Sequence, residues 1–178
     1  MPAAQERIAS PKDGEYGAPY ARYVARVPAG DIVATLREQL AETIGMLRDL
    51  DPSRTTSGYA PGKWSIRDIV LHMADTERVM GYRALCIARG EKTPLPGFDE
   101  NAYTPMADAN SRSLESLLEE LAVARAATVA LFDGLPGEAW GRQGTASGMA
   151  VTVRGLAWII AGHERHHVAV IRERYLKS

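Results

Sequence analysis

Four stretches of apolar residues at helical spacing constrain the fold of this chain most. In the first, Asp31 can cap the free amides, and Leu36, Leu40 and Ile44 form one apolar stripe. No stretch shows the sustained alternation of apolar and polar residues that is typical of strands. We therefore expect an all-α four-helix bundle. The predicted helices cover residues 31–51, 66–89, 113–135 and 152–176.

The ends of the later helices carry recognisable start and stop residues. Ser65 followed by Asp68 is a capping-box pattern, and Gly90 is a natural stop for the second helix. Thr152 can cap the fourth helix after the glycine-containing loop "GTASGMAV". Arg174 in its last turn suits the negative end of the helix dipole.

The connections of the predicted bundle are long. About 20 residues, 91–110, separate the second and third helices, which is more than an antiparallel hairpin needs. A crossover there would make these two helices parallel. We expect residues 1–30 to form an extended N-terminal segment, whose tyrosines pack along the bundle. Residues 31–178 then form a single bundle domain.

Composition narrows the classes of partner. Lys plus Arg (21) nearly balances Asp plus Glu (22), with no block of like charge, so we expect no nucleic-acid partner. No signal peptide or membrane-length apolar run is present, which predicts a cytoplasmic protein without a membrane partner. Cys86 is the single cysteine, so a bound metal would need histidine, carboxylate or water ligands. A small molecule is the expected ligand class.

Histidines cluster in the fourth predicted helix, in "AGHERHHVAV". His163 and His167 continue the apolar stripe of Ile160 and Ile171, so both should face the core. At positions i and i+4 their rings lie one turn apart, where two imidazoles can bind one cation. His166 lies about 100° around the helix, on the shoulder of this face. The alternative is a pair of histidines that are simply hydrogen-bonded in the core.

His72 is the candidate for a third ligand. It lies about 10 Å of helix rise from the start of the second helix, and the His163/His167 pair lies about 16 Å from the end of the fourth. These heights nearly match if the two helices are antiparallel. Three imidazoles would leave a coordination position open, as in catalytic sites. Asp68 could orient the His72 ring or only complete the Ser65 cap, and both interpretations stay open.

The segments "GKWSIRDIVLHMADTERV", "LPGFDENAY" and "IIAGHERHHVAVIRERYL", in this order and spacing, resemble the DinB/YfiT-like superfamily of metal-dependent enzymes. The resemblance implies an up-down-down-up bundle, often a homodimer, whose metal ligands correspond to His72, His163 and His167. Zinc or nickel is the expected metal. The implied topology puts the site near two connections, whose candidate pocket residues are Trp64, Phe98, Asp99, Glu100, Asn101 and Tyr103. The alternative for the second connection is a Pro/Gly-stiffened connector.

Three functions stay open at this point. In the first, the metal activates a low-molecular-weight thiol, which attacks a small electrophile as in S-transferases. In the second, the metal activates water, and Asp68 or a loop acid takes the proton during hydrolysis. In the third, the histidines stabilise a non-enzymatic, stress-related module or sense metal. Glu164 and His166 are either next to the site or on the surface.

Overall fold

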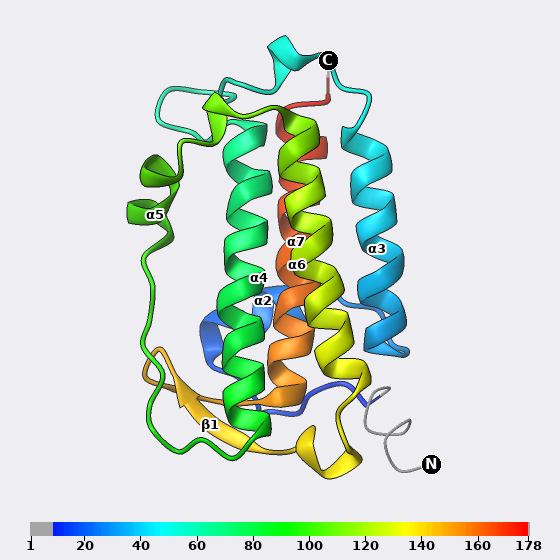
Figure 1. Ribbon diagram of the computed structural model, residues 1–178, viewed down its shortest axis with the longest axis vertical. Helices are drawn as coiled ribbons and strands as arrows, with labels where there is room; N and C mark the ends of the chain where they lie inside the picture. The colour runs from blue at the N-terminus through cyan, green and yellow to red at the C-terminus, as the bar shows by residue number, and fades with distance from the viewer. Residues whose placement is uncertain (1–8, 178) are drawn as a thin grey trace.

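The computed structural model describes residues 9–177 and forms a bundle of four long helices, as predicted. Figure 1 shows that α3 runs upward, α4 and α6 run downward and α7 returns upward, which is the up-down-down-up order. α4 therefore lies parallel to α6 and antiparallel to α7, and it packs against both. The four helices are α3 (Ile32–Leu47), α4 (Ile66–Ala88), α6 (Leu114–Asp133) and α7 (Val153–Arg174).

Side-chain caps define where these helices begin. Asp31 accepts hydrogen bonds from the first amides of α3, and Thr152 Oγ1 accepts one from Gly155 N at the start of α7. Ser65 and Asp68 form the reciprocal capping box at the start of α4. The predicted cap residues are thus the observed ones.

A β-hairpin precedes α7, where the sequence analysis expected a loop. β1 (Gln143–Ala146) pairs antiparallel with β2 (Met149–Thr152), at the lower end of the bundle in Figure 1. Ser147 and Gly148 have φ values of 52° and 73°, the left-handed conformation that a tight hairpin turn needs. Four-residue strands are too short to show a period-two pattern, so the expectation of a loop was wrong.

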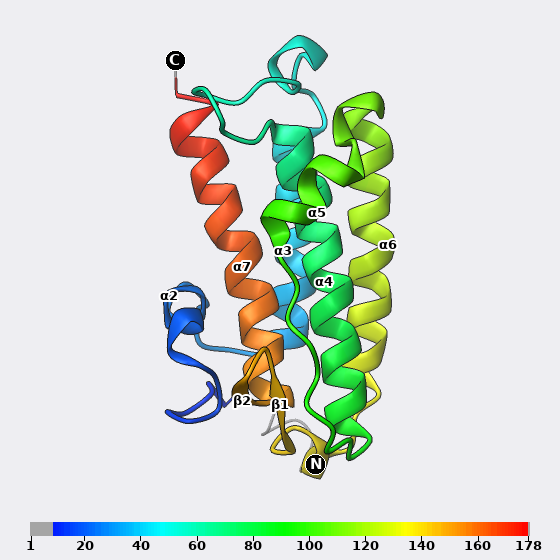
Figure 2. The ribbon, with the colours of Figure 1, turned by 90° about the vertical axis from the view of Figure 1, so that its left-hand side faces the viewer.

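The described part of the N-terminal segment is not simply extended. It contains a 3₁₀ turn (Ala18–Tyr20) and the short helix α2 (Ala21–Val24), which packs against α7 as Figure 2 shows. A Cβ at Gly162 would lie 2.0 Å from the carbonyl oxygen of Tyr23, so the two backbones are in direct contact. Residues 1–8 of the predicted segment lie outside the described residues.

The long connection between α4 and α6 returns along the bundle beside α4 (Figure 2). It contains α5 (Glu100–Ala107), which begins at the N-cap Asp99 and packs against α4. This return is what allows α4 and α6 to run parallel. Further 3₁₀ turns cover Pro52–Arg54, Ala109–Ser111 and Gly137–Ala139. Within residues 9–177, no helix combines the length and apolar character needed to cross a bilayer.

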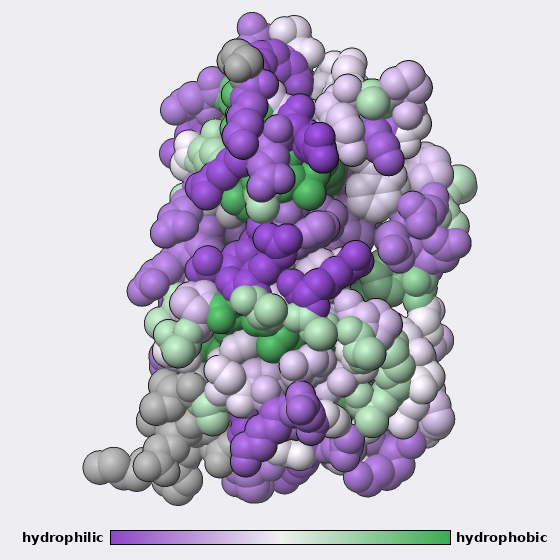
Figure 3. Space-filling model, turned by 180° about the vertical axis from the view of Figure 1, so that it is seen from behind, coloured by the Kyte–Doolittle hydropathy of each residue, from purple (hydrophilic) through white to green (hydrophobic). Residues whose placement is uncertain are grey.

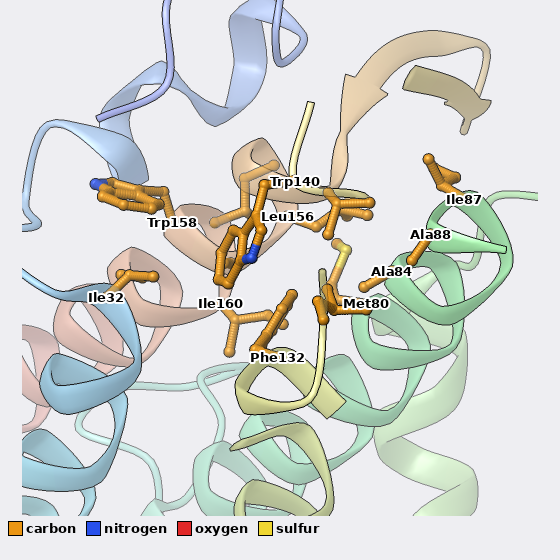
Figure 4. Packing of buried hydrophobic residues seen from close by; sticks show 14 of the residues in the cluster. Ile32, Met80, Ala84, Ile87, Ala88, Phe132, Trp140, Leu156, Trp158 and Ile160 are labelled. Atoms are coloured by element: carbon orange, nitrogen blue, oxygen red, sulfur yellow. The ribbon is translucent and has the colours of Figure 1, made fainter. Parts of the chain in front are cut away.

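The core consists of two apolar clusters, one toward each end of the bundle. In the lower cluster, shown in Figure 4, Trp140 stacks on Phe132 with ring centroids 5.5 Å apart. Each long helix contributes apolar residues to both clusters and buried polar residues between them. The polar residues of this middle layer are Gln39 and Thr43 on α3, His72, Thr76 and Glu77 on α4, Arg125 and Thr128 on α6, and His163 and Glu164 on α7.

Candidate metal centre

The three predicted ligands converge in this middle layer. His72 Nε2 lies 3.0 Å from His163 Nε2, which lies 3.1 Å from His167 Nε2. One ring nitrogen from each residue lies within 4.8 Å of the others. The i, i+4 spacing on α7 provides two of these nitrogens, and the antiparallel packing of α4 brings the third. The structure therefore brings together histidines about ninety residues apart in the chain.

Aromatic rings pack around the three imidazoles. The Trp64 ring lies 4.8 Å from His72, and the Tyr23 ring lies edge-on to His163 at 5.4 Å, both between centroids. His72 and His163 are each only 8% exposed, so their rings are held by packing. Such contacts restrict the ring orientations before any ligand binds.

Burial keeps these imidazoles neutral. Desolvation lowers the pKa of His72 to about 4. Burial, followed by the neighbouring imidazoles, lowers the pKa of His163 and of His167 well below 6.5. A neutral imidazole has a free nitrogen lone pair, which is the form that binds a metal. This donor set fits a divalent ion such as zinc or nickel, with a coordination position left for another ligand.

A buried ion-pair cluster lies in the same layer. Arg125 on α6 binds Glu77 on α4 through Nε (2.5 Å) and Nη2 (2.9 Å), and it binds Glu164 on α7 at 2.9 Å. Two carboxylates against one guanidinium leave this cluster with one net negative charge. Burial raises the pKa of Glu77, against the effect of Arg125. An uncompensated buried charge is costly, and a cation on the nearby imidazoles would offset it.

Residues 163–167, HERHH, also fit the pattern H-E-x-x-H, which the sequence analysis overlooked. In metalloproteases with this pattern the glutamate is the general base. Here Glu164 is 2% exposed, and besides Arg125 it accepts hydrogen bonds from Gln39 and Thr43. Its carboxylate is therefore committed to the helix interfaces and is not on the surface.

A cavity of about 350 Å³ lies against the histidines. Of the predicted pocket residues, Trp64, Phe98 and Glu100 line it. Further residues that line the cavity, which the sequence did not predict, come from the N-terminal segment and from the β-hairpin. These wall residues are Tyr20, Arg22, Tyr23, Ser147 and Met149.

The other predicted site residues have different surroundings. The Asp99 carboxylate accepts hydrogen bonds from the first amides of α5, and Tyr103 packs against Phe98 at 5.6 Å between centroids. Asn101 does not line the cavity. Asp68 Oδ2 accepts hydrogen bonds from Ser65 N and Oγ, each at 2.8 Å, so its contacts are those of the capping interpretation.

Two further polar residues face the cavity. His166 is half-buried, and its ring lies 5.4 Å from the Tyr23 ring. Thr76 Oγ1 is buried and has no hydrogen-bond partner among the described residues. Thr76 lies four residues after His72, and this i, i+4 spacing was the available sequence signal.

A second cavity, of about 410 Å³, lies between α3 and α7 and does not include the three histidines. Its lining is mostly charged or polar, with Arg26, Glu42, Arg165 and Arg172 among its residues. α7 lies behind α4 and α6 in Figure 1, and Figure 3 shows a hydrophilic band across the middle of that rear face. Of these two cavities, the histidine cavity is the one that combines possible metal ligands with aromatic walls.

Comparison with known proteins places this site in a family. Residues 35–171 match the family model of the DinB superfamily, a range that contains all three histidines. A protein of Oceanobacillus iheyensis named "Putative metal-dependent hydrolase" is 31% identical over an alignment of 147 residues, and the match covers 79% of this chain and 79% of that protein.

Two solved structures share the fold. YfiT from Bacillus subtilis, described as "a probable metal-dependent hydrolase with an unusual four-helix bundle topology", superposes with a TM-score of 0.73 at 20% identity, over 93% of this chain and 90% of that one. The mycothiol-dependent maleylpyruvate isomerase gives a TM-score of 0.65 at 17% identity, over 82% of this chain and 61% of that one. The family match and the overall similarity agree: this chain belongs to the DinB superfamily.

Proposed function

We propose that this chain is a metal-dependent enzyme whose divalent ion, zinc or nickel, is held by His72, His163 and His167. The observation that carries the proposal is the convergence of three neutral imidazoles within 4.8 Å at the wall of a 350 Å³ cavity. The net negative charge of the buried Arg125 cluster supports it, because it favours a cation nearby. The names of the O. iheyensis and B. subtilis relatives agree with a metal-dependent activity.

Within this class, we favour transfer of a small-molecule thiol to an electrophile. A divalent ion held by the three histidines would lower the pKa of a thiol in the cavity, so that a thiolate would be available at neutral pH. The thiol proton would pass to solvent, and the sulfur would bond to an electrophilic carbon as the bond from that carbon to its leaving group breaks, the leaving group taking the electron pair. Tyr23 packs against the ring of His163, and Trp64 packs against the ring of His72, so both restrict the orientation of the ligand rings. The name of the mycothiol-dependent structural relative is consistent with thiol chemistry.

The positions of the carboxylates favour this reaction over hydrolysis. Activation of water calls for a general base within reach of the site. Glu164 is bound to Arg125, and Asp68 completes a helix cap. Among the described residues that line the cavity, Glu100 is the one carboxylate, and it is exposed. Hydrolysis with Glu100 as base is the second candidate, which the names of two relatives favour.

Metal analysis of protein purified without a polyhistidine tag tests the metal site. We expect about one divalent ion per chain, lost in His163→Ala and retained in His166→Ala, since His166 lines the cavity outside the group of three. Failure of the wild-type protein to bind a divalent metal would refute both enzymatic candidates and leave a non-enzymatic module.

Activity assays separate the two reactions. Thiol-dependent consumption of a model electrophile, abolished in His72→Ala, is the result expected for transfer. Turnover of esters or amides without thiol, abolished in Glu100→Gln, would instead establish hydrolysis. Homodimerisation stays a prediction, which light scattering of the purified protein checks.

A further inference from the structure

Two opposite charges stand at the walls of the histidine cavity. Arg22 lies on α2, which packs against α7, and Glu100 lies at the start of α5, which packs against α4 (Figure 2). The cavity wall formed by α2 therefore carries a positive charge, and the wall formed by α5 carries a negative charge.

The position of Arg22 is fixed by its neighbour. The guanidinium carbon lies 4.7 Å from the centroid of the Tyr23 ring, and Nη2 donates a hydrogen bond to Tyr23 Oη at 2.8 Å. Tyr23 in turn packs edge-on against His163. Because Arg22 has five N–H donors, this contact leaves donors for an anion.

Neither charge has an ion-pair partner in the part of the chain that the structure describes. Within residues 9–177, no carboxylate forms an ion pair with Arg22, and no cationic side chain forms one with Glu100. The rest of the cavity wall is mixed: Tyr20, Trp64 and Met80 are among its aromatic or apolar residues, and the histidines, Thr76 and Ser147 are polar. Two separated charges without an ion-pair partner among the described residues can orient a ligand through its polar ends.

We propose that the substrate of this cavity is a small zwitterion, whose anionic group binds Arg22 and whose cationic group binds Glu100. This inference rests on the proposed function, because the thiol lies between the two charges, next to His72, His163 and His167. A low-molecular-weight thiol that carries both a carboxylate and an amine has the required chemistry. Arg22 and Glu100 then determine specificity, and the histidines hold the metal.

Three small thiols of different charge test the two charged walls separately. The cobalt(II)-loaded protein is titrated at low ionic strength with 2-mercaptoethanol (neutral), 3-mercaptopropionate (anionic) and cysteamine (cationic). Binding of sulfur is followed by the charge-transfer absorbance of the cobalt site, which does not depend on turnover. Arg26→Gln and Glu119→Gln are matched controls, since both residues are exposed and neither lines this cavity.

We expect Arg22→Gln to weaken binding of 3-mercaptopropionate by about two- to five-fold and to leave the other two thiols unchanged. Glu100→Gln should weaken binding of cysteamine by the same factor and spare the other two. Both effects should shrink at high salt, since exposed charges are screened.

A negative result would show whether the zwitterion inference, the thiol chemistry or the metal site is wrong. Equal affinities of wild type, Arg22→Gln and Glu100→Gln for all three thiols would overturn the zwitterion inference while the metal-thiol function stands. A cobalt-loaded protein that binds no thiol would refute thiol chemistry itself. A wild-type protein that takes up no cobalt would refute the metal site.

Discussion

Replacement of Arg125 by methionine tests whether the buried ion pairs join the four helices. Its guanidinium donates hydrogen bonds to the Leu36 carbonyl oxygen on α3 (2.7 Å), to both oxygens of Glu77 on α4 and to Glu164 on α7. Arg125 itself belongs to α6, so one side chain contacts all three other helices. Arg125→Met keeps an unbranched, flexible side chain but is shorter, and it removes the guanidinium group with its charge and its donors.

The size of the expected loss of stability follows from the two carboxylates that would remain. Glu77 and Glu164 are 2–3% exposed, so both carboxylates would remain buried without their cation. Breaking a buried ion pair by removing one partner costs about 3–5 kcal/mol. For a domain of this size, that corresponds to a fall in Tm of about 6–20 °C. Urea unfolding followed by circular dichroism gives the change in the free energy of unfolding directly.

A second substitution checks whether uncompensated buried charge causes the loss of stability. In the Arg125→Met background, Glu77→Gln removes one of the two orphaned charges and should recover part of the lost stability. A loss below about 1 kcal/mol in the single variant would refute the argument, since it falls within the range of an exposed pair. Further destabilisation in the double variant would show that charge is not the cause.

Three more outcomes are expected. Zinc or nickel at a hundred-fold excess over Kd should add about 2.7 kcal/mol to the free energy of unfolding, raising Tm in wild type but not in His163→Ala. Burial lowers the folded-state pKa of His72 to about 4, so the unfolded state binds more protons below pH 6.5. His72 alone should therefore lower metal-free stability by about 3 kcal/mol between pH 6.5 and 4, and His163 and His167, whose pKa values are lowered in the same direction, should add to this loss. Denaturant titrations across this range check it, and a flat profile would contradict it. Gly162→Ala should displace the N-terminal segment, because the new Cβ would meet the Tyr23 carbonyl oxygen, and limited proteolysis should then cleave this segment faster. The control is Gly45→Ala, whose Cβ meets open space, and equal cleavage rates in the two variants would refute the contact.

The bundle was predictable because the sequence signals that indicate its helices are local. Apolar spacing, the cap residues Asp31, Ser65 and Thr152, and the long connection after the second helix all lie in short stretches of sequence. The grouping of His72 with His163 was compatible with helix rise on the condition that the two helices are antiparallel, and the resemblance to the DinB/YfiT-like superfamily implied it.

The rest of the site depends on contacts between distant segments. Arg22 and Ser147 face the same cavity although they lie 125 positions apart, and neither carries a motif. The pairing of Arg125 with Glu164 is likewise set by how α6 and α7 pack. One sequence signal did exist: Arg125 stands in the otherwise apolar stretch "LAVARAATVA", where a lone cation inside a helix core indicates a buried partner.

The N-terminal segment that walls the cavity has a consequence for how such proteins diversify. Its residues Tyr20, Arg22 and Tyr23 precede residue 35, where the match to the DinB superfamily begins, whereas all three histidines lie within that match. The segment is attached to α7 by backbone contacts at two glycines, Gly155 and Gly162. The three histidines therefore lie on the matched bundle, whereas Arg22, one of the two residues proposed to select the substrate, lies on a separable piece of chain. Exchange of this segment between relatives should alter the Arg22 end of the cavity and leave the imidazoles and Glu100 in place.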